Sequence, residues 1–154
     1  MPVRTSTAIW SGGIRDGHGR VSTKSGVLMG NEYSFGSRFS NDEGTNPEEL
    51  LGAAHAGCFS MALSAALEQA GFKVTSITTK DRVNIEQQGD GFRITKIEIE
   101  TVGIVEGIDE DTFRDFAEDA KDNCPVSKAL AGVGFELVTR CLQCEEVKEE
   151  AMVA

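Results

Sequence analysis

The sequence has 154 residues, a length that favours one domain with its own hydrophobic core. Its net charge of −10, from 25 acidic and 15 basic side chains, argues against partners such as nucleic acids or anionic membranes, both of which favour positive charge. The first ten residues hold no continuous apolar run of signal-peptide length, so we expect a cytoplasmic protein.

Residues 1–36 are predicted to form an antiparallel sheet. Residues 4–10 are rich in β-forming side chains and run into Ser11-Gly12-Gly13, a sequence typical of a turn. Three further short extended runs, separated largely by glycines, follow at 20–23, 26–29 and 33–35. A loop over residues 37–44 then leads to a long helix.

The helix predicted over residues 47–70 is the most apolar part of the chain. Asn46 is a good N-cap and Pro47 fits the first helical position, although Thr45 with Glu48 gives an equally acceptable start one residue earlier. Gly71 is a natural residue just past the C-terminus of this helix.

Between Leu50 and Leu67 only His55, Ser60 and Ser64 are polar, so little of this helix can face water without exposing apolar surface. The segment approaches membrane-spanning length, but its Ala, Gly and Ser content favours a buried helix of a soluble protein. One small sheet covers one side only, and we expect a second subunit to cover the other.

The remaining elements predict an α+β fold. Alternating residues on both sides of Gly89-Asp90-Gly91 predict a long β-hairpin over 74–105. An apolar stripe capped by Asp109, followed by Cys124-Pro125, predicts two helices within 109–131. A last strand is predicted over 134–142, followed by an acidic tail over 145–154.

Cys58 and Cys124 are the strongest candidates for chemistry. In a reducing compartment, thiols are catalytic, metal-binding or simply buried. Cys58 lies in the apolar middle of the long helix, where it is either a small core residue or a reactive thiol that needs a nearby cation. Cys124 precedes the proline at a helix start, a position that favours a thiolate and suits a resolving thiol, or is an incidental cap.

Arg38 is the nearest candidate cation in the sequence, and Glu48 could fix its guanidinium through a two-point contact. The alternatives are an exposed loop cation and an ordinary helix N-terminal acid. A straight helix separates Glu48 from Cys58 by about 15 Å, so one site containing both needs a break in the helix or a second copy of the chain.

The other candidates are weaker. Cys141 and Cys144 form a C-x-x-C at the end of a predicted strand, and no second motif completes a zinc site. His55 lies three residues before Cys58, a spacing that packing alone explains, and His18 lies in a Gly-rich turn without an evident partner. We predict no cofactor and no resident metal.

With these residues identified, the sequence resembles the OsmC (osmotically inducible protein C) branch of the peroxiredoxin-like family that also contains the organic hydroperoxide resistance proteins. Five segments carry the resemblance. They are residues 10–12, 19–26, 33–39, 44–64 and 123–127.

The resemblance implies an OsmC-like domain over 1–154, with antiparallel sheets around the central helix of an intertwined homodimer whose active sites lie at the subunit interface. It also implies a peroxidase that acts in oxidative and osmotic stress and reduces organic hydroperoxides, and hydrogen peroxide less well. By matching positions, Cys58 would be the peroxidatic cysteine, Cys124 the resolving one, and Arg38 with Glu48 the activating pair. The disulfide would be reduced by an external, lipoyl-type dithiol. Cys141 and Cys144 lie outside the family pattern and leave open a thiol relay or a metal contact.

A competing interpretation is a non-catalytic, stress-induced dimer that binds a small apolar ligand at its interface, with Cys58 serving only in packing.

Overall fold

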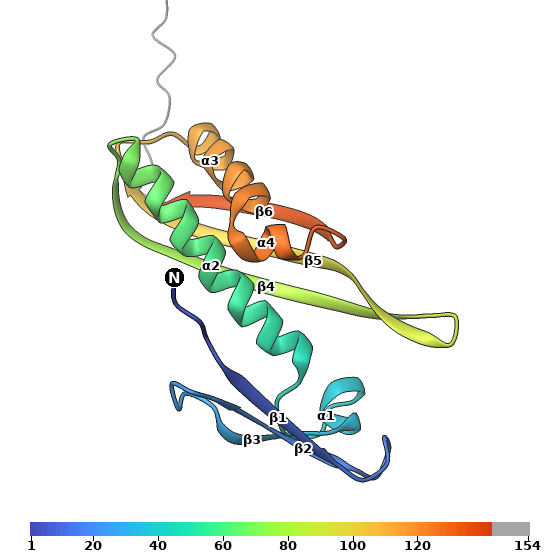
Figure 1. The fold of residues 1–154 in the computed structure, drawn as a ribbon. Helices are drawn as coiled ribbons and strands as arrows, with labels where there is room; N and C mark the ends of the chain where they lie inside the picture. The colour runs from blue at the N-terminus through green and yellow to red at the C-terminus, as the bar shows by residue number, and fades with distance from the viewer. Residues whose placement is uncertain (143–154) are drawn as a thin grey trace, which may run out of the picture. The chain divides into compact units, whose positions relative to one another are not determined.

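The computed structural model describes residues 1–142, which divide into two compact units, Met1–Leu50 and the part of the chain from Leu51 onward. The first unit contains an antiparallel sheet in the order β1-β2-β3. Its strands are β1 (Ser6–Ser11), β2 (His18–Thr23) and β3 (Met29–Tyr33), followed by the short helix α1 (Phe35–Phe39) and the first turn of α2 (Pro47–Gln69) (Figure 1).

Helix α1 corrects the sequence prediction, which placed an extended run over 33–35 and a loop from residue 37. Ser34 and Ser37 form a reciprocal capping box: the Ser37 N–H donates to Ser34 Oγ over 3.0 Å, and the Ser34 N–H donates to Ser37 Oγ over 2.8 Å. The usual sequence signal has Glu or Gln at the second of these positions. Serine fills it here, so the pattern was not recognisable as a helix start.

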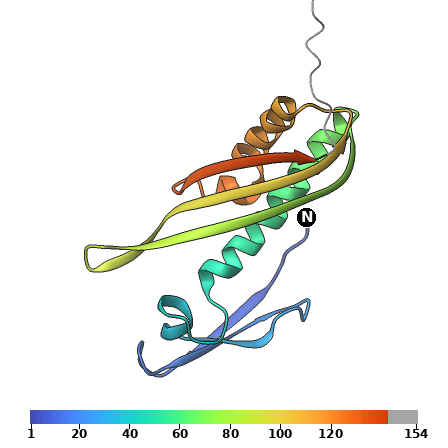
Figure 2. The same cartoon turned by 180° about the vertical axis from the view of Figure 1, so that it is seen from behind.

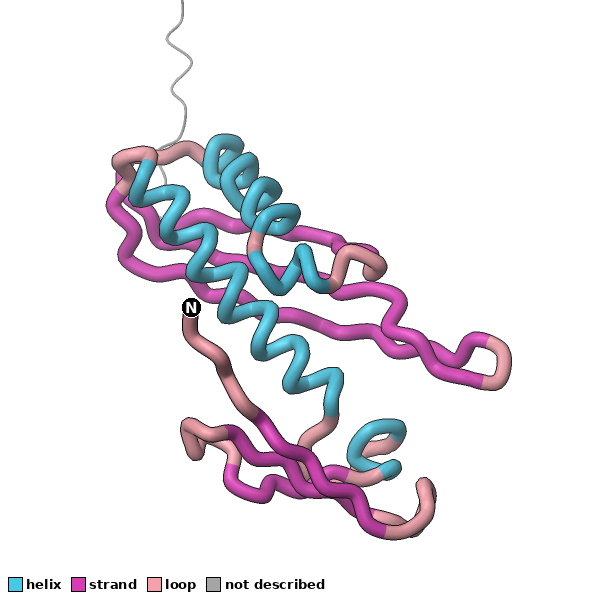
Figure 3. The backbone as a smooth tube through the Cα atoms, in the orientation of Figure 1, coloured by secondary structure: helices cyan, strands magenta, loops and turns pink. Residues whose placement is uncertain are grey.

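The second unit packs helices on one face of a three-stranded sheet. Figures 1 and 2 show α2, α3 and α4 together on that face. The elements after α2 are β4 (Lys73–Gln88), β5 (Gly91–Glu106), α3 (Glu110–Asn123), α4 (Pro125–Ala129) and β6 (Gly134–Leu142). Figure 3 shows how far the β4–β5 hairpin runs as continuous strand before its tight turn. The acidic tail predicted over 145–154 lies outside the described residues.

Strand β6 pairs with β5 in parallel, whereas the sequence analysis predicts antiparallel sheets. The reason is the connection: α3 and α4 lie between the two strands, and a helical crossover returns the chain in the same direction. The β4–β5 pair and the whole first sheet are antiparallel, as predicted.

One face of α2 forms the core of the second unit. Phe59, Leu63 and Leu67 are fully buried there, together with Ile97 of β5 and Phe113 of α3. By length and composition alone α2 could also span a membrane. Its apolar character continues round the helix, because the outward face is small or apolar as well. In the described chain this face exposes Ala53, Ala54, Gly57, Ala65 and Met61, whose exposed fraction is 76%.

Candidate functional site

The first group of candidate site residues lies where α1 is joined to α2 in the first unit. The Ser37 hydroxyl donates to the Thr45 carbonyl over 2.8 Å, and the Asn46 amide donates to the Ser37 carbonyl over 3.1 Å. Asn46 also caps α2, because its Oδ1 accepts the Glu49 N–H at 2.8 Å. Of the two starts that the sequence allowed, the helix uses Asn46. These bonds hold the end of α1 beside the first turn of α2.

Arg38 and Glu48 meet across this junction. Arg38 Nε lies 3.1 and 3.2 Å from the two carboxylate oxygens, and Nη2 lies 2.7 Å from Oε1. The Glu48 side chain is 8% exposed and that of Arg38 is 38% exposed. The guanidinium also lies 5.1 Å from the centre of the Phe39 ring. The cation is therefore fixed in direction and still partly open to solvent.

The second group of candidate residues lies in the second unit, where Cys58 of α2 is half-buried against the core. Burial is the largest effect on its thiol and raises the pKa above the ordinary value. The Cys124 thiol also raises it, while a hydrogen bond from the Val126 backbone lowers it. A raised pKa leaves the thiol largely neutral at pH 7. Among the described residues, no cation contributes to the pKa of Cys58, although a reactive thiolate needs one.

Cys124 lies beside Cys58 because a proline ends helix α3. Pro125 disfavours helical geometry at the preceding residue, and Cys124 takes φ −64° and ψ 145° between α3 and α4. Its exposed fraction is 1%, and its sulfur accepts the Ser127 N–H at 3.3 Å. The structure thus places Cys58 next to Cys124 within the second unit. It pairs Arg38 with Glu48 within the first unit.

Sequence reasoning missed a set of buried polar groups next to Cys124. His55 Nδ1 lies 2.5 Å from Asp81 Oδ2, and His55 Nε2 lies 2.9 Å from Ser127 Oγ. Ser127 Oγ in turn lies 3.0 Å from Cys124 Sγ. In the sequence, His55 stood out only as a neighbour of Cys58. A buried histidine in an otherwise apolar stretch was the one available signal, because buried polar groups need partners.

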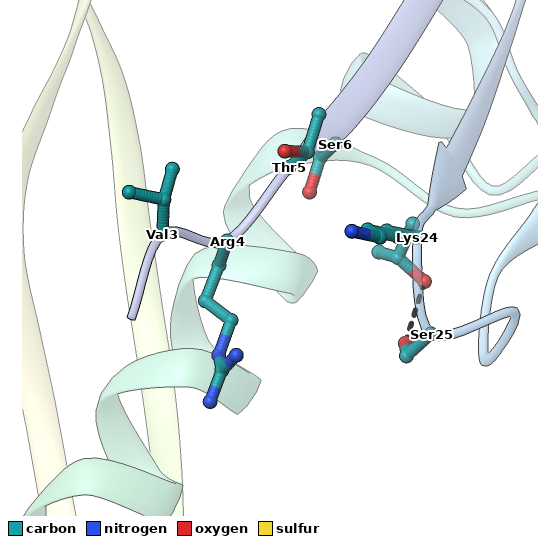
Figure 4. Close-up of a pocket in the computed structure, with 7 residues that line it drawn as sticks. Val3, Arg4, Thr5, Ser6, Lys24 and Ser25 are labelled. Atoms are coloured by element: carbon teal, nitrogen blue, oxygen red, sulfur yellow. Dashed lines mark hydrogen bonds between the residues drawn. The ribbon is translucent and has the colours of Figure 1, made fainter. Parts of the chain in front are cut away.

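A hollow of about 470 Å³ lies in the first unit between the start of the chain and the end of β2. Figure 4 shows Arg4, Lys24 and Ser25 among its lining residues. Thr23 also lines it, and its hydroxyl is hydrogen-bonded to that of Ser25 at 3.0 Å. None of the four predicted site residues lines it. The hollow therefore gives no support to a ligand site at the predicted residues.

A model of the OsmC-like protein family matches residues 40–138, which include Glu48, Cys58 and Cys124. The chain belongs to the OsmC-like family. The curated protein "Peroxiredoxin OsmC" of Escherichia coli is 52% identical over 123 residues, which is 80% of this chain and 86% of that protein. The "Organic hydroperoxide resistance protein-like 2" of Staphylococcus epidermidis is 32% identical over 134 residues, covering 82% and 88%.

Solved structures agree with the OsmC-like assignment. The crystal structure of an organic hydroperoxide resistance protein from Elizabethkingia anophelis has a TM-score of 0.72 and 28% identity, and covers 92% of this chain and 99% of that one. An OsmC-like protein from Mycoplasma pneumoniae has a TM-score of 0.71 at 11% identity, which supports the fold alone.

The C-x-x-C of this OsmC-like chain is only half described. Cys141 lies on β6, where its backbone N–H donates to the Glu110 carboxylate at 3.1 and 3.2 Å. Cys144 lies outside the described residues. Over residues 1–142, no three His, Cys, Asp or Glu side chains are grouped so that they could hold a metal ion.

Proposed function

We propose that this protein is a cysteine-based peroxidase that reduces organic hydroperoxides, and hydrogen peroxide less well. Membership of the OsmC-like family and the similarity to a curated peroxiredoxin support the reaction class. The observation that carries the proposal is the adjacency of the Cys58 and Cys124 thiols, since this chemistry needs an attacking thiol and a second thiol to resolve it.

In the proposed reaction, the Cys58 thiolate attacks the terminal peroxide oxygen, the O–O bond breaks, and the alcohol leaves. Cys58 becomes a sulfenic acid. Cys124 then attacks the sulfenic sulfur, which releases water and forms a Cys58–Cys124 disulfide. An external dithiol, of the lipoyl type, restores both thiols by exchange.

Because the pKa of Cys58 is raised, other residues must stabilise its thiolate. Burial disfavours the thiolate, and an opposite charge within about 4–6 Å favours it. We therefore assign Arg38 the role of activating cation and Glu48 that of holding its guanidinium. The two-point contact between these side chains supports the assignment, because it fixes the direction in which the guanidinium points.

We also propose that the working unit is a homodimer. The outward face of α2 is apolar over several turns and carries the largely exposed Met61. Contiguous apolar surface of this kind is typical of an interface. A second copy of the chain would bury it.

Peroxide turnover by wild-type, Cys58→Ser and Cys124→Ser proteins tests the function. With cumene hydroperoxide and dihydrolipoamide, we expect turnover by the wild type and none by Cys58→Ser. In Cys124→Ser, we expect Cys58 to be oxidised once, without formation of the disulfide through which the wild type is recycled. Glutathione in place of dihydrolipoamide tests the preference for a dithiol. Equal activity of wild type and Cys58→Ser would instead favour the non-catalytic dimer.

A further inference from the structure

The second unit contains a buried chain of hydrogen-bonding groups that ends at Cys124. It runs from Asp81 of β4 through His55 of α2 to Ser127 of α4, and the three contacts measure 2.5, 2.9 and 3.0 Å. His55 is fully buried, Ser127 and Cys124 are 4% and 1% exposed, and the Asp81 side chain is 1% exposed. Such an assembly is costly to bury and needs every donor to find an acceptor.

With an ionised Asp81 and a neutral His55, the three contacts can form one continuous series of hydrogen bonds. A carboxylate only accepts, so Nδ1 of His55 carries the proton that faces Asp81, and Nε2 is left as an acceptor. The Ser127 hydroxyl therefore donates to Nε2, and its oxygen accepts the thiol proton of Cys124. All three hydrogens point from Cys124 towards Asp81, as a path for one proton requires.

The neighbours of His55 hold its ring in place for this path. The Phe135 ring of β6 stacks on the imidazole with centroids 5.1 Å apart, and the centroid of the tilted Phe59 ring lies 6.2 Å away. Gly52 allows β4 to approach, because a Cβ at that position would lie 3.3 Å from Val83 and 3.7 Å from the Asp81 Cβ. The imidazole can thus accept a proton without moving.

Asp81 is the one charged group in direct hydrogen-bond contact with His55 among residues 1–142, and its second oxygen, Oδ1, has no hydrogen-bond partner there. Three further titratable groups line a hollow of about 290 Å³ together with Ser127. They are Lys121, Asp122 and Lys128.

We propose that Asp81, His55 and Ser127 form a proton relay that deprotonates Cys124 as it attacks the Cys58 sulfenic acid; the proposal rests on the peroxidase function above. The S–S bond forms as the Cys58 S–O bond breaks, so the Cys124 sulfur is oxidised and the Cys58 sulfur is reduced. The thiol proton passes through Ser127 to His55, and the leaving hydroxide takes a proton from solvent to become water.

The same path runs backwards during recycling. When the external dithiol attacks the disulfide at the Cys58 sulfur, Cys124 leaves as a thiolate and the dithiol gives up a proton to solvent. His55 returns its proton to Cys124 through Ser127, and the chain is reset. Ser127 touches a reacting atom and acts in catalysis, whereas His55 and Asp81 act through it as positioning residues.

The experiment compares Ser127→Ala and Asp81→Asn with the wild type after one equivalent of cumene hydroperoxide. Loss of the Cys58 thiol should stay within about twofold of wild type. Disulfide formation should slow by about tenfold or more, because a positioned base contributes roughly 10²–10⁴-fold to a proton transfer. Sulfenic acid should accumulate and be trapped by dimedone. A wild-type rate of disulfide formation in both variants would overturn the proposal.

A pH series separates a relay from a packing effect. In the variants hydroxide replaces the missing base, so the disulfide rate should rise by up to about tenfold per pH unit, whereas the wild-type rate levels off. A rate lowered equally at every pH would overturn the proposal. Ser60→Ala is the matched control, since Ser60 also bonds from α2 to β4, at 2.7 Å to Thr79, without leading to Cys124. An equal slowing in Ser60→Ala would count against the relay.

Two measurements keep the test decisive. Circular dichroism and thermal melting identify folded variants, and Ser127→Ala, the smallest change, decides the outcome if Asp81→Asn does not fold.

Diamide, a thiol oxidant, is used to form the Cys58–Cys124 disulfide without any peroxide. Failure of cumene hydroperoxide to oxidise Cys58 would contradict the peroxidase function alone, and slower disulfide formation with diamide in Ser127→Ala would still support the relay.

Discussion

Glu48 accepts hydrogen bonds from two different nitrogens of Arg38, Nε and Nη2, at distances between 2.7 and 3.2 Å. A lysine ammonium is a point charge on a flexible stem and cannot reproduce this fork. The pair therefore determines where the guanidinium points as well as supplying its charge. If this cation activates Cys58, then both direction and charge should affect the reactivity of the thiol.

Arg38→Ala is expected to raise the pKa of Cys58, because removing a nearby positive charge disfavours the thiolate. Burial already raises this pKa, so both effects have the same sign and less thiolate is present at pH 7. The pH midpoint of Cys58 alkylation by iodoacetamide, followed on its own peptide by mass spectrometry, should move upward by about 1–3 pH units. Arg38→Lys should fall between wild type and Arg38→Ala.

Arg20→Ala is the control for this series. Arg20 lies in the same unit and pairs with Glu32 at 3.3 Å, but both side chains are more than half exposed. The alkylation profile of Arg20→Ala should match the wild type. An unchanged profile in Arg38→Ala would remove Arg38 from the site.

Glu48→Gln is expected to lower kcat/KM for cumene hydroperoxide by about tenfold, since a neutral amide holds the guanidinium less firmly than a carboxylate. Glutamine has nearly the same size, so α2 should keep its start. Steady-state turnover with a dithiol measures the effect. Glu49→Gln is the matched control: Glu49 is the exposed neighbour in the same helical turn, and its substitution should leave kcat/KM within about twofold. A wild-type kcat/KM in Glu48→Gln would contradict the assigned role of the carboxylate.

The regular elements of the fold followed from local patterns. The sequence predicts a helix over 47–70 and a strand over 134–142, and α2 and β6 span Pro47–Gln69 and Gly134–Leu142. Gly71 and Gly89 take φ values of 94° and 60°, as a helix end and a tight turn require. Each of these signals lies within a few residues of the structure that it predicts.

The buried relay could not be predicted in this way. His55 contacts Asp81, which is 26 residues away, and Ser127, which is 72 residues away. Sequence spacing carries no information on contacts made between separate elements of a fold. The two thiols raised the same difficulty: the local sequence marked Cys58 and Cys124 separately as candidates, and only the packing of α2 against the α3–α4 junction shows that they are neighbours.

Gly103→Ala is expected to destabilise the second unit by about 1–3 kcal/mol, the usual cost of overpacking a core. A Cβ at Gly103 would lie 2.4 Å from the ring of Phe113, which is fully buried and has little room to move. Urea unfolding measures the change. Gly91→Ala in the same strand is the control, because its Cβ would meet no atom within 4 Å. Equal stability of the two variants would contradict the prediction and show that Phe113 shifts to make room for the added methyl group.

Met61→Asp is expected to weaken the proposed dimer, because it places a charge on the apolar outward face of α2. Burying an unpaired carboxylate at an interface costs several kcal/mol, so the dissociation constant should rise by at least about a hundredfold. Sedimentation velocity over a dilution series measures it. Val138→Asp is the matched control: Val138 is 66% exposed but lies between Glu136 and Arg140 on the outward face of β6. A dimer that persists in Met61→Asp, with the same dissociation constant as in Val138→Asp, would show that this face of α2 does not form the interface.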